Sequence, residues 1–379
     1  MKSLKDTLKR TFLRKRTLIL LLAVIGEVCL KIAEKSSFFA EEIFGRHIFK
    51  WMSVGISALT GIFPFSVAEF MIITAPFLAI ALIAGFIVKL VKNKKDFLYL
   101  ILTFILNAAC MGSVIWFFYC FGCGINYYRY PVSTYFELET RDSSAEELAA
   151  LLGELADTAI KERAQLTTFN DKGVYILPDT PQMLGKEAKK AYAGFSEKYP
   201  IFSGPYPAPK CVMFSHLMSY TNIIGLYTCW TMEANVDVDI TAYEIGSTMC
   251  HELAHLRGFI REDEANFISY MVCMDSDSHD LRYSGTMLAF NYTANALAGK
   301  NMDLYAKTIS EHYDPGMWLD LEANREYWKQ FEKAKVVSEV TTELNDNYLK
   351  ANDQDDGVES YGRVVDLLLA KYRKDNNLD

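Results

Sequence analysis

The stretch "MCHELAHLRGFIREDEAN" (residues 249–266) decides how the second half of this chain folds, because it contains two histidines four residues apart. Residues four apart on an α-helix project from the same face, so the imidazoles of His251 and His255 can reach one metal ion. Glu252 follows the first histidine and is placed to take a proton from a water at that ion. The spacing H-E-x-x-H therefore predicts a catalytic metal site, provided that the segment is helical.

The residues around the motif favour a helix. In "TAYEIGSTMCHELAHL" (241–256), Ile245, Met249 and Leu253 recur every four residues and form an apolar stripe. This stripe lies largely away from the two histidines, so one face of the helix can pack in a core while the other binds a metal ion. The pattern predicts a helix over 242–257.

A third protein ligand is required, because catalytic zinc sites use three protein ligands and a water whereas structural sites use four protein ligands. Metzincins, with H-E-x-x-H-x-x-G-x-x-H, take a histidine from the position that Arg261 occupies here. Arginine is permanently cationic and cannot serve. We expect Gly258 to end the first helix and a second helix over 262–275 to fold an acid back toward the histidines. Three acids compete for this role: Glu262, Asp263 and Glu264.

The pair "HELAH" and "EDEAN" resembles the arrangement of gluzincins, found in thermolysin-like, HtpX-like and ImmA-type peptidases, whose third ligand is a glutamate on a second helix. The resemblance implies that Glu262 binds zinc and that Asn266 orients a ligating histidine. Glu264 is the alternative, although Ile268 would then stand at the orienting position. The chain departs from most gluzincins in its short spacer of six residues between His255 and Glu262.

A wider resemblance covers most of the chain. The chain is similar to an uncharacterised family of membrane-anchored bacterial H-E-x-x-H proteins, which implies a place in a bacterial cell membrane but no particular substrate. Besides the N-terminal apolar runs, the shared segments are "EANVDVDI" (233–240), "HELAHLRGFIREDEANF" (251–267), "YSG" (283–285) and "NDNYLKANDQDDGVESYGRVVDLLLA" (345–370).

A peptidase also needs a donor that stabilises the oxyanion forming on the substrate carbonyl. In "ESYGRVV" (359–365), Tyr361 and Arg363 flank a glycine between two segments of helical pattern, which is typical of a loop over a cleft. We therefore expect Tyr361 and Arg363 to act in catalysis together with Glu252.

These residues predict a membrane-anchored zinc metalloendopeptidase, in which Zn²⁺ is held by His251, His255 and an acid, Glu252 is the general base, and a peptide or protein is the substrate. Two alternatives stay open. The domain is a non-catalytic, zinc-containing sensor or assembly module at the cell surface, or it is a zinc hydrolase of a non-peptide bond. The intact Glu252 argues against the first alternative, because a structural site needs no base.

Apolar runs before residue 125 predict a membrane anchor. A helix crosses the ~30 Å hydrocarbon core with about 20 apolar residues, and the predicted spans are 17–35, 67–91 and 97–121. The first run lacks a small-x-small cleavage site and is expected to stay a helix. The segment between the first two spans, 36–65, is amphipathic and aromatic, which favours an interfacial or re-entrant piece.

Basic residues set the expected orientation in the bilayer. The first sixteen residues carry seven Lys and Arg against one acid, and the loop after the second span is "KLVKNKKD" (89–96). Both should face the cytoplasm by the positive-inside rule. The predicted domains are therefore a three-helix transmembrane anchor over 1–124 and an extracytoplasmic metallopeptidase domain over 125–379.

Charge excludes one class of partner. The chain has a net charge of −8 although its first sixteen residues sum to +6, so the remainder is strongly acidic. Nucleic-acid binding needs a basic footprint and is not expected. The eight cysteines, in a chain of 379 residues, do not indicate a disulfide scaffold.

The domain over 125–379 is expected to be an α+β, mostly helical, zincin-like domain with a small sheet. Strand patterns occur at 211–215 and within 222–240, where "NVDVDI" alternates. "GLYTCWTMEANVD" (225–237) suggests a strand beside the active-site helix, and in gluzincins such an edge strand pairs with an extended substrate. Helical patterns cover 143–166, 242–257, 262–275, 283–298, 302–312, 322–350 and 358–374.

Overall fold

The computed structural model describes residues 4–12, 15–332, 335–350 and 363–378. The protein is mostly helical, at 74%, with a small three-stranded sheet, which confirms that part of the predicted fold class. The chain divides into two compact units that are described separately. Unit 1 comprises residues 1–49, 67–129 and 229–231, and unit 2 comprises residues 50–66, 130–228 and 232–379. Residues 50–66, predicted as part of the anchor, therefore belong with unit 2.

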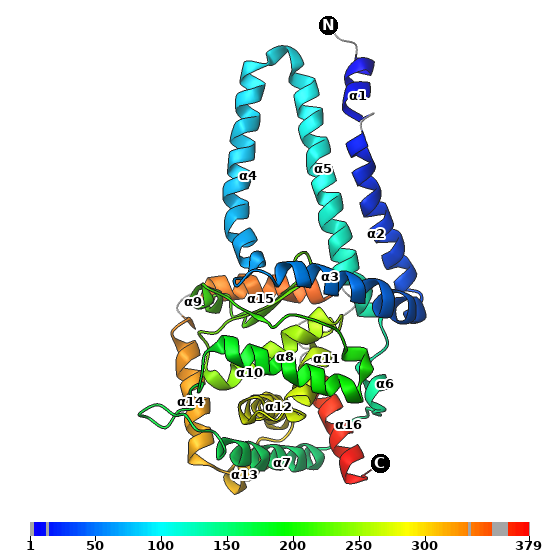
Figure 1. Ribbon diagram of the computed structural model, residues 1–379. Helices are drawn as coiled ribbons and strands as arrows, with labels where there is room; N and C mark the ends of the chain where they lie inside the picture. The colour runs from blue at the N-terminus through cyan, green and yellow to red at the C-terminus, as the bar shows by residue number, and fades with distance from the viewer. Residues whose placement is uncertain (1–3, 13–14, 333–334, 351–362, 379) are drawn as a thin grey trace. The chain divides into compact units, whose positions relative to one another are not determined.

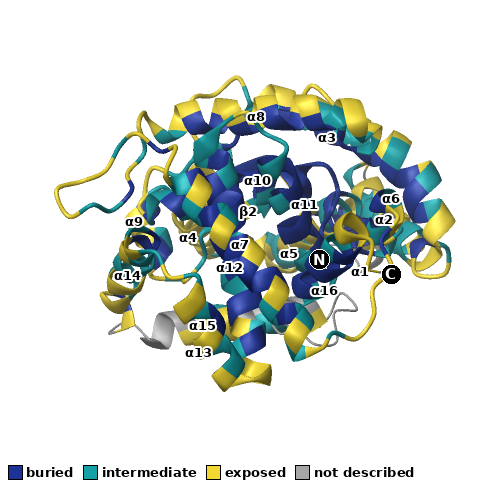
Figure 2. Cartoon of the chain, turned by 90° about the horizontal axis from the view of Figure 1, so that it is seen from below, coloured by how far each residue is buried: buried dark blue, intermediate teal, exposed yellow. Residues whose placement is uncertain are grey.

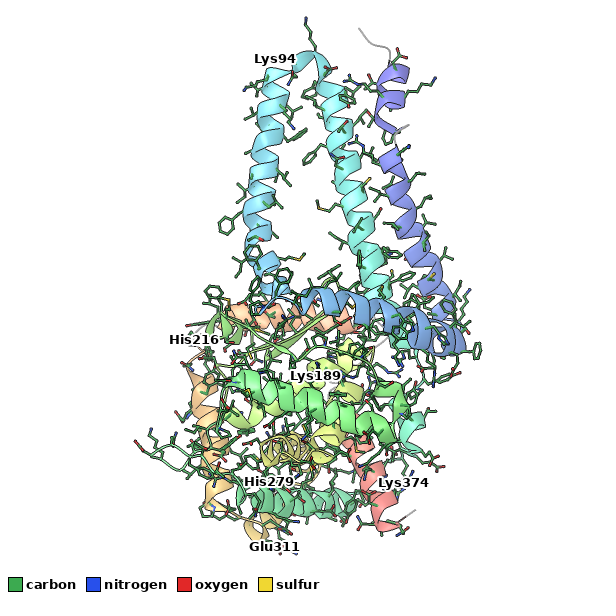
Figure 3. The ribbon with its side chains drawn as sticks, in the orientation of Figure 1. Lys94, Lys189, His216, His279, Glu311 and Lys374 are labelled. Atoms are coloured by element: carbon green, nitrogen blue, oxygen red, sulfur yellow. The ribbon has the colours of Figure 1, made fainter. Side chains whose placement is uncertain are left out.

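Unit 1 consists of helices. They are α1 (Leu4–Phe12), a 3₁₀ helix (Lys15–Ile19), α2 (Leu20–Ala33), a π-helix (Phe39–Phe49), α4 (Val67–Lys92), a 3₁₀ turn (Lys94–Asp96), α5 (Phe97–Gly122) and a 3₁₀ helix (Gly124–Tyr128). Lys94 marks the tip of the hairpin that α4 and α5 form (Figure 3). Two stretches, Val67–Lys92 and Lys94–Tyr128, are long and apolar enough to cross a membrane. The predicted first span forms α2, which has only 14 residues and is not one of these two.

A buried ion pair holds the π-helix of unit 1. Glu41 accepts a hydrogen bond of 2.7 Å from Nε of Arg129, and both side chains are buried. Arg46, one turn further along the π-helix, approaches the same carboxylate at 3.1 Å. Burying one of these charges without its partner would cost several kcal/mol, about 3–5 by analogy with other buried pairs. The pair therefore fixes the segment before residue 50 to the segment after α5.

Unit 2 is built around two buried helices, α10 (Ala242–Leu256) and α11 (Glu262–Met274), which Figure 2 colours dark blue over most of their length. α12 (His279–Lys300) packs on both and lies between α10 and α7 (Ala145–Arg163) (Figure 1). The remaining helices are α3 (Lys50–Thr60), α6 (Val132–Phe136), α8 (Pro181–Lys198), a 3₁₀ turn (Pro200–Phe202), α9 (Ser215–Ser219), α13 (Met302–Glu311), α14 (Pro315–Lys329), α15 (Lys335–Lys350) and α16 (Val364–Asn376).

The sheet of unit 2 lies against α10. Its order is β1 (Lys210–Cys211), β3 (Glu233–Val236), β2 (Gly225–Thr228), with β1 parallel and β2 antiparallel to β3. β3 is the central strand and is buried on both faces. β2 lies at one edge of the described sheet. The predicted strand pattern up to Ile240 ends early, at Val236. The next residue, Asp237, is buried and accepts hydrogen bonds from Ser219 and from the backbone of Asp239, which turns the chain.

The helices of unit 2 differ from the predicted ones in several places: α12 begins at His279 rather than at 283, and α14 begins at Pro315 rather than at 322. The pattern predicted as one helix over 322–350 forms two helices, α14 and α15. Helix α8 was not predicted, and its C-terminal turn occupies residues that were assigned to a loop. The structure thus divides one predicted helix and adds α8 and the two short helices α6 and α9.

Asp320 on α14 joins three segments of unit 2. Its carboxylate is 1% exposed and accepts hydrogen bonds from the Arg163 side chain (2.8 Å), the Tyr283 hydroxyl (2.7 Å) and the Tyr175 backbone N–H (2.7 Å). Arg163 ends α7 and Tyr283 belongs to α12. One carboxylate therefore satisfies a half-buried cation and two buried donors.

Replacing Asp320 with Ala should lower the free energy of unfolding by about 3–5 kcal/mol, because the half-buried Arg163 would lose its partner and the buried donors of Tyr175 and Tyr283 would lose their acceptor. The control is Glu322→Ala, which removes an exposed pair with Arg325 on the same helix and should cost less than about 1 kcal/mol. Denaturant unfolding of the full chain in detergent measures both. Equal losses in the two variants would contradict the role given to Asp320.

Candidate metal centre

Helix α10 presents the two histidines of the motif side by side. The ring centroids of His251 and His255 are 4.5 Å apart, with the ring planes at 86°. The side chain of His255 is 7% exposed and that of His251 is 13% exposed. Their neighbours on the helix are buried against the core, as the apolar stripe predicted.

Hydrogen bonds fix which nitrogen of each imidazole faces the centre. Nδ1 of His255 lies 2.7 Å from the backbone oxygen of Phe259, and Nδ1 of His251 lies 2.8 Å from Oδ1 of Asn266. Both partners are acceptors, so each Nδ1 carries a proton, and each Nε2 can offer its lone pair to a metal ion once it is deprotonated. This is the arrangement in which outer partners orient metal-binding histidines. Asn266 occupies the place that the sequence predicted for it.

The turn after α10 requires Gly258. Its φ angle is +86°, in the left-handed region that favours glycine. The N–H of Gly258 bonds to the oxygen of His255 at 2.8 Å, and the N–H of Phe259 bonds to the oxygen of Ala254 at 3.2 Å. The chain then reverses, and α11 begins at Glu262 beside the end of α10.

Glu262 faces both histidines. Its Oε2 is 3.1 Å from Nε2 of His251, and its Oε1 is 3.7 Å from Nε2 of His255. Burial acts to raise the pKa of the Glu262 carboxyl, but the charges and hydrogen bonds of His255 and His251 outweigh it and hold that pKa well below its usual range. In return, Glu262 overcomes the opposing effect of burial and raises the pKa of His255 to about 9. The three side chains form one tightly coupled cluster.

The two competing acids point elsewhere. Glu264 accepts a hydrogen bond of 2.8 Å from the backbone N–H of Val132 and pairs with Arg261 at 2.7 Å. Asp263 pairs with Arg363 at 3.5 Å. Of the three acids at the start of α11, the structure thus brings Glu262 to the histidines, and Glu264 anchors the start of α6.

Glu252 lies between the histidines and the edge strand β2. A Cβ atom added to Gly225 would stand only 2.1 Å from Oε1 of Glu252, so this contact requires glycine. The backbone N–H of Tyr227 donates a hydrogen bond to the carboxylate. Among the described residues, Oε2 of Glu252 is buried without a hydrogen-bond partner. Burial raises the pKa of this carboxyl to about 7, although the charges of His255 and His251 oppose the rise.

These donors fit a small divalent metal ion. A tetrahedral zinc holds nitrogen and oxygen ligands at about 2.0–2.2 Å, which places the ligand atoms roughly 3.3–3.6 Å from one another. The distances of 3.1 and 3.7 Å between Glu262 and the two Nε2 atoms bracket that value. Glu252 also lies within 4.8 Å of both histidines and is a possible donor by distance alone. Its contacts with Gly225 and Tyr227 draw it toward β2, so Glu262 is the better third donor.

Of the two expected oxyanion donors, the structure describes only Arg363. Arg363 lies at the start of α16, pairs with Asp263 and is 40% exposed, and Tyr361 falls outside the described residues. Sequence reasoning missed Tyr292, whose hydroxyl accepts a hydrogen bond of 3.1 Å from Nδ2 of Asn266. This contact fixes the amide so that its oxygen faces His251. Tyr292 lies on α12, far along the chain from the motif, so no pattern near the motif could have predicted this contact.

Comparison with known proteins identifies the family of the chain. The family model described as "Protein of unknown function (DUF3810)" matches residues 44–369. The chain belongs to this family. No curated protein and no solved structure matches the chain. The DUF3810 match includes the whole of α10 and α11, and the family description assigns no activity to them.

Replacing Glu262 with Gln should weaken zinc binding by more than about 100-fold, because losing a hydrogen-bond partner of a ligand already costs 10- to 100-fold. The matched control is Glu264→Gln, which keeps an acceptor for Val132 and should leave zinc affinity within about threefold. Zinc content after dialysis against graded chelator, determined by elemental analysis of the full chain, measures both. Loss of zinc only in the Glu264 variant would reverse the assignment.

Proposed function

We propose that this protein is a membrane-anchored zinc metallopeptidase. The observation that carries the proposal is the geometry of His251, His255 and Glu262, with each histidine held by an acceptor at Nδ1 and with the carboxylate facing both Nε2 atoms. Glu252, buried with an unpartnered oxygen beside this cluster, supplies the base that a structural site would not need. The resemblance of "HELAH" and "EDEAN" to gluzincins supports the same function.

Glu252 is suited to move protons. With its pKa near neutrality, the carboxyl can take a proton and return it, which is the requirement for a general base that later acts as an acid. Zinc, when bound, acts as a Lewis acid that polarises water and the scissile carbonyl. In the proposed reaction, Oε2 of Glu252 accepts the proton of the attacking water and delivers it to the leaving amine.

An extended peptide is the substrate that the surroundings favour. β2 is the edge strand of the described sheet, and its Gly225 touches the general base. A peptide that pairs with the edge of β2 would run past Glu252 in extended form, with backbone hydrogen bonds supplying affinity. The proposed substrate is therefore an unfolded segment of a peptide or protein.

The proposed anchor has three spans. α4 and α5 have the length and apolarity of membrane helices. α2 is about 21 Å long at 1.5 Å per residue, and the 3₁₀ helix Lys15–Ile19 adds about 10 Å at 2.0 Å per residue. Together they match the ~30 Å hydrocarbon core. With the basic N-terminus and the Lys-rich loop in the cytoplasm, residues 125–379 lie outside the cytoplasm of a bacterial cell.

The Glu252→Gln variant should bind zinc as the wild type does and lose at least about 100-fold in peptide cleavage, because general acid–base catalysis contributes 10²–10⁴-fold. Its matched control is Glu244→Gln on the same helix, a half-buried glutamate whose pKa is also raised by desolvation to about 7. That variant should keep its activity. Cleavage of a peptide library by the full chain in detergent, followed by mass spectrometry, measures both.

Two outcomes would contradict the proposal. Zinc bound by the wild type without any cleavage would favour a sensor or assembly module. Cleavage that survives in the Glu252 variant would exclude this residue as the base.

The proposed topology predicts opposite results for two reporter fusions. Alkaline phosphatase, which folds only outside the cytoplasm, should be active when fused after residue 379 and inactive when inserted after Lys94. The reason is that the basic segments resist translocation. A green fluorescent protein at the same sites should give the reverse pattern. Phosphatase activity at Lys94 together with none at the C-terminus would invert the orientation.

A further inference from the structure

Helix α3 has its polar and apolar faces reversed relative to a helix on the surface of a soluble protein. Ser53 and Ser57 point inward and are fully buried. Trp51 and Leu59 point outward and are 63% and 65% exposed. A surface helix in water places its apolar stripe inward and its polar residues outward. An outer face of this kind is typical of a helix that contacts an apolar medium.

The inward serines have partners. Ser53 donates a hydrogen bond of 2.7 Å to the backbone oxygen of Leu256, and Ser57 donates one of 3.3 Å to Val54. The helix is thus fixed against unit 2 in this orientation by a buried hydrogen bond and cannot be rotated to hide its apolar side without breaking it. The outward apolar face is a fixed feature of unit 2.

A second segment extends this apolar face. Lys210 donates hydrogen bonds to the backbone oxygens of Thr60 and Phe63, which ties the end of α3 to β1. After β1 the chain exposes Met213, Phe214 and Leu217 around α9. In Figure 1, α3 and α9 lie along the same side of unit 2. The lipid-facing patch, as we name it, comprises Trp51, Leu59, Ile62, Phe63, Phe65, Met213, Phe214 and Leu217.

We propose that unit 2 rests on the bilayer through the lipid-facing patch. The chain itself indicates lipid as the occupant. Residues 51–68 carry no charged side chain, and α4, a helix apolar enough to cross a membrane, begins at Val67. Phe65 is two residues away, so it lies within about 7 Å of the entry point of α4. A patch of this composition matches an interfacial element with its side chains about 5–10 Å below the headgroups.

This contact fixes the distance between the metal centre and the bilayer. Leu256, which Ser53 holds, directly follows His255 on α10. One helix, about 10–12 Å in diameter, therefore separates the end of α10 from the lipid. A centre so placed acts on peptide segments close to the membrane surface. The proposal rests on the membrane anchor proposed above, but the contact itself does not require peptidase activity.

Nitroxide labels on the full chain in phosphatidylethanolamine–phosphatidylglycerol vesicles test the contact. The labels replace Ile62 and Leu217 in the patch, which are 75% and 62% exposed, and Met302 on α13 as a control that is 61% exposed. A fourth label, at Ile80 of α4, reports the anchor. The partly exposed Cys29 and Cys211 are first changed to Ser, which leaves the buried cysteines of the described chain unlabelled.

Collision rates with oxygen and with a water-soluble nickel chelate give the depth of each label. We expect the labels at Ile62 and Leu217 to favour oxygen and to lie about 5–10 Å below the phosphates, while the label at Met302 favours nickel. Patch labels as accessible to nickel as the Met302 label would overturn the proposal. So would patch labels shielded from both reagents, since a second copy or another protein would then cover the patch. If the Ile80 label also meets nickel, the anchor itself is wrong.

Discussion

The left-handed turn at Gly258 is the constraint on which the metal centre depends. A residue with a side chain would lose about 1–2 kcal/mol in this conformation, and the reversal of the chain would become strained. The turn lets the backbone oxygen of Phe259 bond to His255, and α11 starts only seven residues after that histidine. Both histidines, Glu252 and the facing carboxylate of Glu262 therefore come from the twelve residues 251–262, before any distant part of the chain contributes.

Three acidic side chains in the first turn of α11 point in different directions. Successive residues of an α-helix point about 100° apart, so Glu262, Asp263 and Glu264 cannot share one target. Each buried carboxylate has a different cation: the histidines, Arg363 and Arg261. All three also lie where the N-terminal end of the helix favours negative charge. Three carboxylates gathered at one point would repel one another. The helix directs them to three separate partners, so the charges are stabilised instead.

Local periodicity made much of this centre predictable. The pattern around His251 gave α10 to within one residue, and the resemblance pointed to Glu262 and Asn266. Contacts with no local pattern were not predictable. Gly225 must be glycine because Glu252, 27 residues later, packs against it. Helix α8 begins with a proline, and lysines and glycines interrupt the apolar periodicity of its buried face. The alternating pattern beyond Val236 predicted a strand that does not form. The chain turns there because the buried Asp237 accepts hydrogen bonds from Ser219 and from the backbone of Asp239.

The end of α10 explains why α3 must turn polar residues inward. The last four carbonyls of a helix lack partners within it, and when buried they require partners from elsewhere. In α10 the partners of residues 253 to 256 are, in order, the side chain of Arg257, the N–H of Phe259, the N–H of Gly258 and the hydroxyl of Ser53. Residues 257–259 of the local turn supply three of these hydrogen-bond donors. The carbonyl of Leu256 receives its donor from elsewhere. Ser53 supplies it, so α3 must turn this serine toward α10, and the opposite side of the helix carries the exposed Trp51 and Leu59.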